Sequence, residues 1–283
     1  MTDNFHCDVH VFDAPLGAEI RGIQLGQHVR GEHIVQILRA FDEHHVLVFR
    51  DQELDNDRQL EVSEWFGPRY VAPPDLPMLG GIDQPPVIAV SNVVEGGLLG
   101  NGMIPGHSDI NFVAVPVLGA MLRAVEVPKS GGATSWSNLI TAYDELEADM
   151  KQRIDGLNSY AINPFAGKAG ELGVAGESQK TLAADASKFA HPIARTHPPT
   201  GKKSLYIGIT NFEIDGLSAA ESARILNVLQ EHVSQDKYYY THQWRPGDVV
   251  FWDNRCTNHK REAFDNKERR VMYRVQIAGT RPF

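Results

Sequence analysis

The chain has 283 residues, of which 42% are hydrophobic and 22% are charged, and its formal net charge is −9. This length can bury a large core in one domain, and the composition is typical of a globular protein. The negative charge argues against a nucleic acid as partner, because phosphate groups are bound by basic surfaces. We therefore expect a single domain over residues 1–283.

The sequence predicts neither a secretory signal nor a membrane span. The N-terminal run MTDNFHCDVHVFD lacks a basic region followed by an apolar stretch. No stretch reaches the roughly 18 apolar residues that a membrane helix needs. The two cysteines, Cys7 and Cys256, lie far apart, and we expect reduced thiols. These features predict a cytoplasmic protein with no membrane partner.

In chain order, the first expected elements alternate between helix and strand. Residues 32–41 carry apolar side chains at helical spacing, and the run VLVF directly after them is typical of a buried strand. Residues 56–66 are expected to be helical before FGPRYVAPPDLP forms a proline-rich loop. VIAVS and VLGAMLRAVEV are β-like runs, and an apolar stripe from Tyr143 to Leu157 predicts one helix.

The second half is expected to hold a long loop, a helix and further strands. The segment 163–190 is rich in Gly, Ala, Ser and Lys, which predicts a mobile loop. Ser218 and Glu221 form a capping box that opens a helix ending near Ser234. SLYIGIT, DVVFW and RRVMYRVQIAG read as strands. Many short strands with a few outer helices predict a mainly β fold, a β-sandwich or jelly roll with flanking helices.

The segment GHSDINF carries the first candidate metal ligands. His107 and Asp109 are two residues apart, so on an extended segment both side chains share a face. His259, 150 residues after Asp109, is the candidate third ligand. Two histidines and one carboxylate on one face of an octahedral metal are typical of non-haem Fe(II) oxygenases, and they leave positions for a co-substrate and O2. By itself, a His-x-Asp pair is more often a surface or turn feature.

The strand RRVMYRVQIAG adds two arginines on one face. Alternation with period two places Arg270, Met272, Arg274 and Gln276 together. Buried guanidinium groups are unfavourable unless they meet anions, and a guanidinium matches a carboxylate bidentately. This pattern predicts a site for a dicarboxylic co-substrate. The alternative is an exposed edge strand with two solvated arginines, and the strand pattern alone does not decide between them.

Six segments follow one another along the chain: PLGAEIRGIQL, VLVFRDQELDNDRQLEVSEWFGP, GHSDINF, VEVPKSGGATSWSN, HPIARTHPPTGKKSLYIG and WDNRCTNHKREAFDNKERRVMYRVQIAGTRPF. Through these segments, in this order, the chain resembles almost from end to end the TauD/TfdA family of Fe(II)/2-oxoglutarate-dependent dioxygenases. The resemblance has consequences for fold and site. It implies a double-stranded β-helix (a jelly roll of the cupin type), with iron held by His107, Asp109 and His259. It also implies that Thr134 and Arg270 bind the distal carboxylate of 2-oxoglutarate.

For the substrate, the resemblance implies that Arg274 binds an anionic group and that Trp252 lies near the metal. Further substrate-contacting positions of the taurine enzyme correspond to Ala72, Asp75, Met103 and Ala166. These four differ from the residues of that enzyme, which makes taurine an unlikely substrate and predicts a more apolar pocket.

The expected activity is oxidation of a C–H bond, by hydroxylation, in a small anionic molecule other than taurine, with release of succinate and CO2. Fe(II) is the expected metal, and 2-oxoglutarate and O2 are the expected co-substrates. An intact Asp109 argues against halogenation. The alternatives are a desaturase, cyclase or oxidative decarboxylase of the same cofactor class, a zinc hydrolase, and a non-catalytic jelly roll that binds a metal or ligand. The resemblance further implies a homo-oligomer, a dimer or tetramer.

Overall fold

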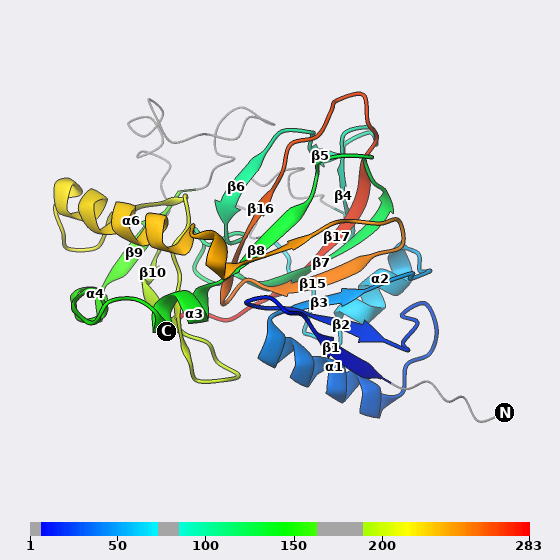
Figure 1. The fold of residues 1–283 in the computed structure, drawn as a ribbon, viewed down its shortest axis with the longest axis horizontal. Coiled ribbons are helices and arrows are strands. Elements are labelled where there is room, and N and C mark those ends of the chain that lie inside the picture. The colour runs from blue at the N-terminus through cyan, green and yellow to red at the C-terminus, as the bar shows by residue number, and fades with distance from the viewer. Residues whose placement is uncertain (1–6, 73–84, 163–188) are drawn as a thin grey trace.

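The computed structural model describes residues 7–72, 85–162 and 189–283, and it is mainly β with helices at the periphery (Figure 1). Eight strands form the larger sheet in the order β1-β2-β3-β15-β7-β17-β4-β5. Their bounds in that order are Asp8–Val11, Ala18–Arg21, Val46–Phe49, Val249–Asp253, Val117–Glu126, Val271–Ala278, Ile88–Ser91 and Leu98–Leu99.

A smaller sheet of four strands packs against one face of the larger sheet. Its order is β14-β8-β16-β6, with bounds Tyr239–His242, Thr134–Asn138, Thr257–Arg261 and Ile104–His107. Between the sheets lies a core in which Trp136 of β8 and Trp252 of β15 approach to 5.7 Å between ring centroids. Strands β6, β7, β8, β15, β16 and β17 alternate between the two sheets, so the predicted jelly roll with flanking helices is confirmed.

The other face of the larger sheet is covered by two helices, α1 (Gly31–His44) and α2 (Asn56–Ser63). Ile37 and Phe41 of α1 pack in one core with Leu47 and Phe251 of the sheet. Strand β3, the VLVF run, is therefore buried on both faces, as its unbroken apolar sequence predicts. Both helices were expected from the sequence, and Figure 1 shows α1 along the outer face of the sheet.

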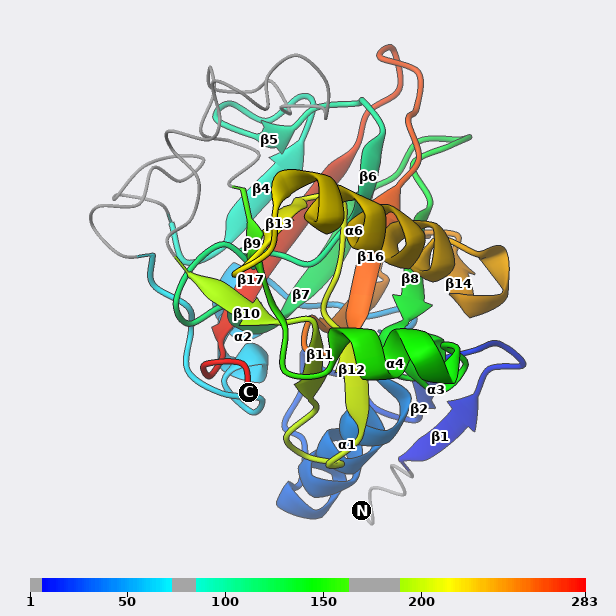
Figure 2. The same ribbon diagram turned by 90° about the vertical axis from the view of Figure 1, so that its left-hand side faces the viewer.

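A second core lies beside the jelly roll and is closed by helix α6 (Ala219–Val233) (Figure 2). The capping box of Ser218 and Glu221 opens this helix as predicted. Two small sheets complete this part, with orders β10-β9-β13 and β11-β12. Their bounds are Ala190–Pro192, Asn158–Ala161, Asn211–Ile214, Ala194–Thr196 and Lys203–Leu205; the 3-10 helix η1 spans Asp236–Tyr238.

Two expectations from the sequence were wrong in detail. The apolar stripe after Tyr143 belongs to two short helices, α3 (Leu139–Asp144) and α4 (Ala148–Ile154), and not to one. Both still bury residues in the same core, which is why the stripe continues across the break. The run SLYIGIT leaves its sheet after Leu205, because the Asn258 and Asn211 side chains then take its backbone hydrogen bonds.

Among the described residues, no helix is long and apolar enough to cross a membrane. The predicted mobile loop at 163–190 lies outside the described residues, apart from its last two positions.

Candidate active site

The three candidate metal ligands meet at one end of the smaller sheet. Strand β6 ends at His107, and Asp109 lies in the turn that follows. Strand β16 pairs with β6 so that His259 lies directly opposite His107. Asp109 Oδ1 is 3.6 Å from His107 Nε2 and 3.8 Å from His259 Nε2. The sequence separates these residues by 150 positions, and the sheet brings their donor atoms together.

The donor atoms of this triad are free to bind a cation. The Nδ1 of His107 lies 2.8 Å from the Pro105 carbonyl, so it donates a proton there and leaves the Nε2 lone pair toward Asp109. Asp109 Oδ2 is buried without a hydrogen-bond partner among the described residues, so its lone pairs are available to a metal. Two imidazole nitrogens and a carboxylate oxygen fit a divalent transition metal.

Electrostatics holds His259 and Asp109 in the ionisation states that bind metals. Burial and the neighbouring His107 lower the pKa of His259 to about 3, so its ring is neutral at physiological pH. Burial alone would raise the pKa of Asp109, but the two histidines and the Arg274 guanidinium outweigh it. The pKa of Asp109 therefore lies below its usual range, and the carboxylate is charged.

The turn that carries Asp109 is held by asparagines that the sequence analysis missed. Asn254 Oδ1 accepts from the Asp109 backbone N–H at 3.4 Å and from Trp252 Nε1 at 3.1 Å. Ser108 donates to Asn258 Oδ1 at 3.0 Å. Ile110 has a positive φ of 52°, which is rare for a β-branched residue. These asparagines come just before His259 in the chain, but no local pattern links them to Asp109.

Arg270 and Thr134, the predicted co-substrate residues, are both buried in the jelly roll. Arg270 is 1% exposed, and its Nε and Nη1 lack hydrogen-bond partners within the described chain. Thr134 Oγ1 accepts from Trp244 Nε1 at 2.9 Å, which leaves the hydroxyl proton to donate elsewhere. Gly132 lies beside Arg270: it has a φ of 71°, and an added Cβ would lie only 3.0 Å from Pro128 Cγ, so glycine is favoured there.

The solvated edge strand considered for RRVMYRVQIAG is wrong. Strand β17 is central, between β7 and β4. Met272 on the same face as the arginines belongs to the core between the sheets. Both Arg270 and Arg274 therefore project from the inner face of the larger sheet, as strand alternation indicates.

The structure places the candidate substrate residues at different depths. Arg274 Nη1 lies 3.5 Å from Asp109 Oδ1, next to the triad. The Trp252 ring packs 5.0 Å from the His259 ring. Met103 is 65% exposed just before β6, and Ala72 is half-buried. Asp75 and Ala166 lie outside the described residues. Contact of any of these with a substrate stays a prediction.

A second group of potential ligands lies deeper in the fold. His45, His197, Asp253 and Cys256 are all buried, and their donor atoms lie within 4.8 Å of one another. Arg255 already neutralises Asp253, with Nη2 2.6 Å from Oδ2 and Nε 2.8 Å from Oδ1. Burial raises the pKa of Cys256 well above its usual value, so its thiol is protonated. This group fits an internal ion pair better than a metal.

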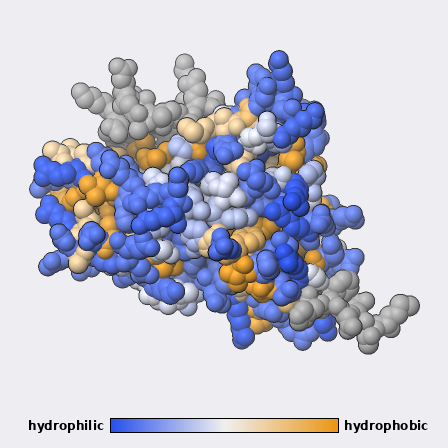
Figure 3. Space-filling model, in the orientation of Figure 1, coloured by the Kyte–Doolittle hydropathy of each residue, from blue (hydrophilic) through white to orange (hydrophobic). Residues whose placement is uncertain are grey.

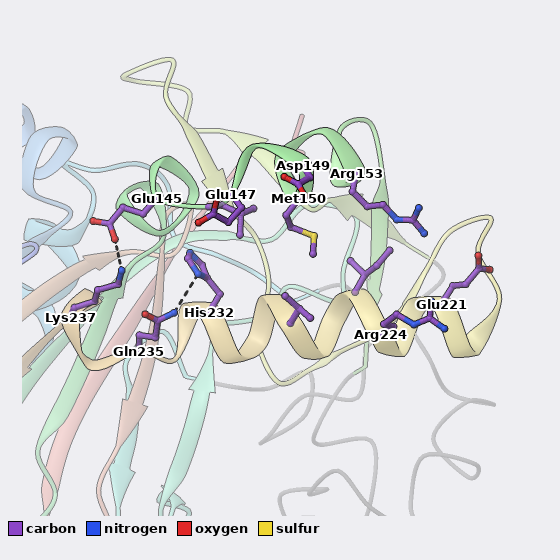
Figure 4. A pocket seen from close by; sticks show the side chains of 13 residues that line it. Glu145, Glu147, Asp149, Met150, Arg153, Glu221, Arg224, His232, Gln235 and Lys237 are labelled. Carbon is purple, nitrogen blue, oxygen red and sulfur yellow. Dashed lines mark hydrogen bonds and ion pairs between the residues drawn. The ribbon is translucent and has the colours of Figure 1, made fainter.

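A surface cavity of about 710 Å³ lies apart from both groups, between α4 and α6 (Figure 4). It is lined by charged side chains at its rim, where Lys237 binds Glu145 at 2.6 Å, and by apolar residues such as Val228. None of the triad, Thr134 or the inner arginines lines it. On the face in Figure 3, hydrophobic patches near α6 are broken up by hydrophilic side chains. This cavity has no arrangement of groups that would support the chemistry of the triad.

Comparison with known proteins gives consistent matches. A sequence profile described as "Taurine catabolism dioxygenase TauD, TfdA family" matches residues 9–276. An (S)-phenoxypropionate/alpha-ketoglutarate-dioxygenase from Sphingobium herbicidovorans is 31% identical over 96% of this chain and 95% of the relative. An alkylsulfatase from Acinetobacter baylyi is 33% identical over 93% and 82%. The solved structure of AAD-2 in complex with Mn(II) and N-oxalylglycine gives a TM-score of 0.80 at 27% identity, and covers 98% of this chain and 99% of that chain.

Proposed function

Since the chain belongs to the TauD/TfdA family and is an alpha-ketoglutarate-dependent dioxygenase, we propose that it uses Fe(II) to hydroxylate a C–H bond of a small organic anion other than taurine. Succinate and CO2 are the co-products. The observation that carries the proposal is the meeting of the His107–Asp109–His259 triad with inward-facing arginines whose sole acidic partner among the described residues is Asp109.

His107, Asp109 and His259 would hold the iron through Nε2, a carboxylate oxygen and Nε2. Bound iron supplies the activation of O2 and the oxidising power, which no side chain of the chain provides. The chain's own contribution is to fix the ligands: the Pro105 carbonyl orients His107, and the Asn254 amide oxygen holds the turn that carries Asp109. A neutral His259 and a charged Asp109 need no change of protonation to bind the metal.

Arg270 and Thr134 would bind the distal carboxylate of 2-oxoglutarate. The free nitrogens of the Arg270 guanidinium donate hydrogen bonds, and so does the Thr134 hydroxyl, because its oxygen already accepts from Trp244. The co-substrate thereby supplies the negative charge that buried Arg270 lacks.

Arg274 would bind the anionic group of the substrate next to the metal. Its Nε has no partner among the described residues, and its Nη1 lies 3.5 Å from Asp109. A phenoxypropionate and an alkyl sulfate, the compounds named in two relatives, are both anions. This arrangement would orient a C–H bond toward the iron. The buried core around Trp252 would exclude water from that side.

We also propose a cytoplasmic enzyme that forms a dimer or tetramer. Cys7 and Cys256 are both buried free thiols, which fits a reducing compartment.

The co-substrate assignment is tested without turnover. Anaerobic addition of 2-oxoglutarate to the Fe(II) protein should give a weak visible charge-transfer band, and Arg270→Ala should need about 10- to 100-fold more 2-oxoglutarate to reach it. Arg269→Ala is the matched control, because Arg269 is the exposed neighbour that pairs with Glu126 at 2.6 Å. A wild-type protein that gives no band contradicts the proposed activity.

The substrate class is tested by succinate release across carboxylates, sulfonates, sulfate esters and phosphonates. We expect active compounds among these anions and lower activity in Arg274→Ala. If only neutral or cationic compounds are active, the role of Arg274 is wrong.

A further inference from the structure

A third arginine, Arg261, is buried beside Thr134. It ends β16 two residues after His259 and is only 4% exposed. Residues two apart on a strand share a face, so Arg261 projects inward as His259 does. Strand β16 also pairs with β8, which places His259 opposite Trp136 and Arg261 opposite Thr134. The smaller sheet therefore presents the Arg261 side chain and the Thr134 hydroxyl next to each other on the inner face.

Arg270 reaches the same place from the larger sheet. A Cβ on Gly132 would lie 3.7 Å from Arg270 Nε and 3.5 Å from the Phe264 ring. The centre of that ring is 5.5 Å from Arg261 Cζ. Burial lowers the pKa of Arg270 to about 9, and the charge of Arg261 adds to the effect. The two guanidinium groups thus lie near one another, Arg270 beside Gly132 and Arg261 beside Phe264.

No acidic side chain in the described part of the chain pairs with either guanidinium. Arg261 Nη2 donates to the carbonyl oxygens of Leu99 and Gly102, whereas its Nε and Nη1 have no partner there. Leu99 has a positive φ of 68°, which is rare for a residue with a branched side chain. Two buried cations that share one region without a counter-ion are unfavourable unless an anion binds between them.

We propose that Arg261 is a second arginine of the 2-oxoglutarate site, which binds the distal carboxylate together with Arg270 and Thr134. This inference rests on the proposed function. The carboxylate would then accept hydrogen bonds from both sheets, from β16 on one side and from the residue before β17 on the other. The consequence is selectivity: a 2-oxo acid without a distal carboxylate leaves both guanidinium groups unpaired.

The test compares binding of 2-oxoglutarate and 2-oxobutyrate, which lacks the distal carboxylate, to the Mn(II)-loaded protein by calorimetry. The variant is Arg261→Gln, whose neutral amide can still donate to the Leu99 and Gly102 carbonyls. It should weaken 2-oxoglutarate binding by about 10- to 100-fold, the loss expected for a charge-assisted hydrogen bond. Binding of 2-oxobutyrate should be unchanged. Arg269→Gln, on the surface, is the control and should change neither.

Equal weakening of both ligands, or unchanged 2-oxoglutarate binding in Arg261→Gln, overturns the role of Arg261. A wild-type protein that binds 2-oxobutyrate as tightly as 2-oxoglutarate contradicts the co-substrate assignment itself, which is a separate failure. If Arg261→Gln does not fold, Arg261→Lys takes its place. Its single ammonium cannot serve the carbonyl oxygens and the carboxylate together, so it should lose at least about threefold for 2-oxoglutarate alone. An unchanged affinity in that variant also overturns the proposal.

Discussion

The His107–Asp109–His259 triad and the deeper group around Asp253 both combine histidine with aspartate, but they differ in what neutralises the carboxylate. Asp253 and Asn254 are adjacent in the chain, yet Asp253 belongs to the group with His45 and His197, whereas Asn254 supports Asp109. Both groups bring donor atoms within 4.8 Å of one another.

In the deeper group, both Asp253 oxygens accept from Arg255, and Oδ2 also accepts from His197 Nε2 at 3.0 Å. In the triad, Asp109 Oδ2 has no partner among the described residues, and Arg274 approaches Oδ1 only to 3.5 Å. Ligand types and spacing are therefore insufficient to identify a metal site. A carboxylate with free lone pairs is the feature that separates a binding site from a structural ion pair.

The largest expected effect is loss of activity in Asp109→Ala. Without the carboxylate the triad loses its anionic ligand, and turnover should fall by roughly 10³-fold or more. Two measurements test this prediction: the metal content of the protein after loading, and the release of succinate with an active substrate. Asp253→Asn provides the comparison: the folded fraction of this variant should bind as much metal per protein molecule as the wild type. Loss of metal binding in Asp253→Asn alone would reverse the assignment of the two clusters.

Asp253→Asn should instead destabilise the fold. It removes the buried counter-ion of Arg255 and leaves only the partly exposed Asp42, 3.3 Å from Arg255 Nη2. The loss costs up to about 3–5 kcal/mol in the free energy of unfolding. Urea denaturation of the metal-free protein measures this. Glu126→Gln, which breaks the exposed pair with Arg269, should leave the midpoint unchanged. Equal midpoints for the two variants would mean that the buried ion pair does not stabilise the fold.

A smaller effect is expected for Asn254→Ala. The Asp109 backbone N–H and the Trp252 indole would lose their shared acceptor, and a supporting contact of this kind typically contributes 10- to 100-fold to metal affinity. Isothermal titration calorimetry with the metal measures this affinity. Unchanged affinity would show that the turn is held by Ser108 and Asn258 alone.

The smallest effect concerns pH. Burial lowers the pKa of His45 to about 4 and that of His259 to about 3, both below the usual value of 6.5. The unfolded chain then binds more protons as the pH falls through 6.5, so stability is full above that pH and is lost below it. The metal-free protein should lose about 1 kcal/mol for each histidine between pH 7.5 and 5.5. His45→Asn, which tolerates the left-handed backbone at φ 66°, should remove the share of His45, about 1 kcal/mol, from that loss in thermal unfolding. A pH profile identical to that of the wild type would exclude His45 as a source.

The sequence alone determined those features that neighbouring residues encode. The structure has three such features as predicted: the capping box of Ser218 and Glu221, the unbroken apolar run of β3, and the alternation that puts Arg270 and Arg274 on one face. That this face points inward was left open by the sequence and decided by the central place of β17. The resemblance to the family extended this to His107, Asp109 and His259, whose donor atoms do lie together.

Tertiary structure decided which distant residues meet. The register of β16 between β6 and β8 sets His259 opposite His107 and Arg261 opposite Thr134, and no local pattern contains that register. The same is true of Asp253, whose capture by Arg255 distinguishes its cluster from the triad only in three dimensions. Register and counter-ion placement depend on packing over the whole chain, because each strand is held by partners far away in sequence.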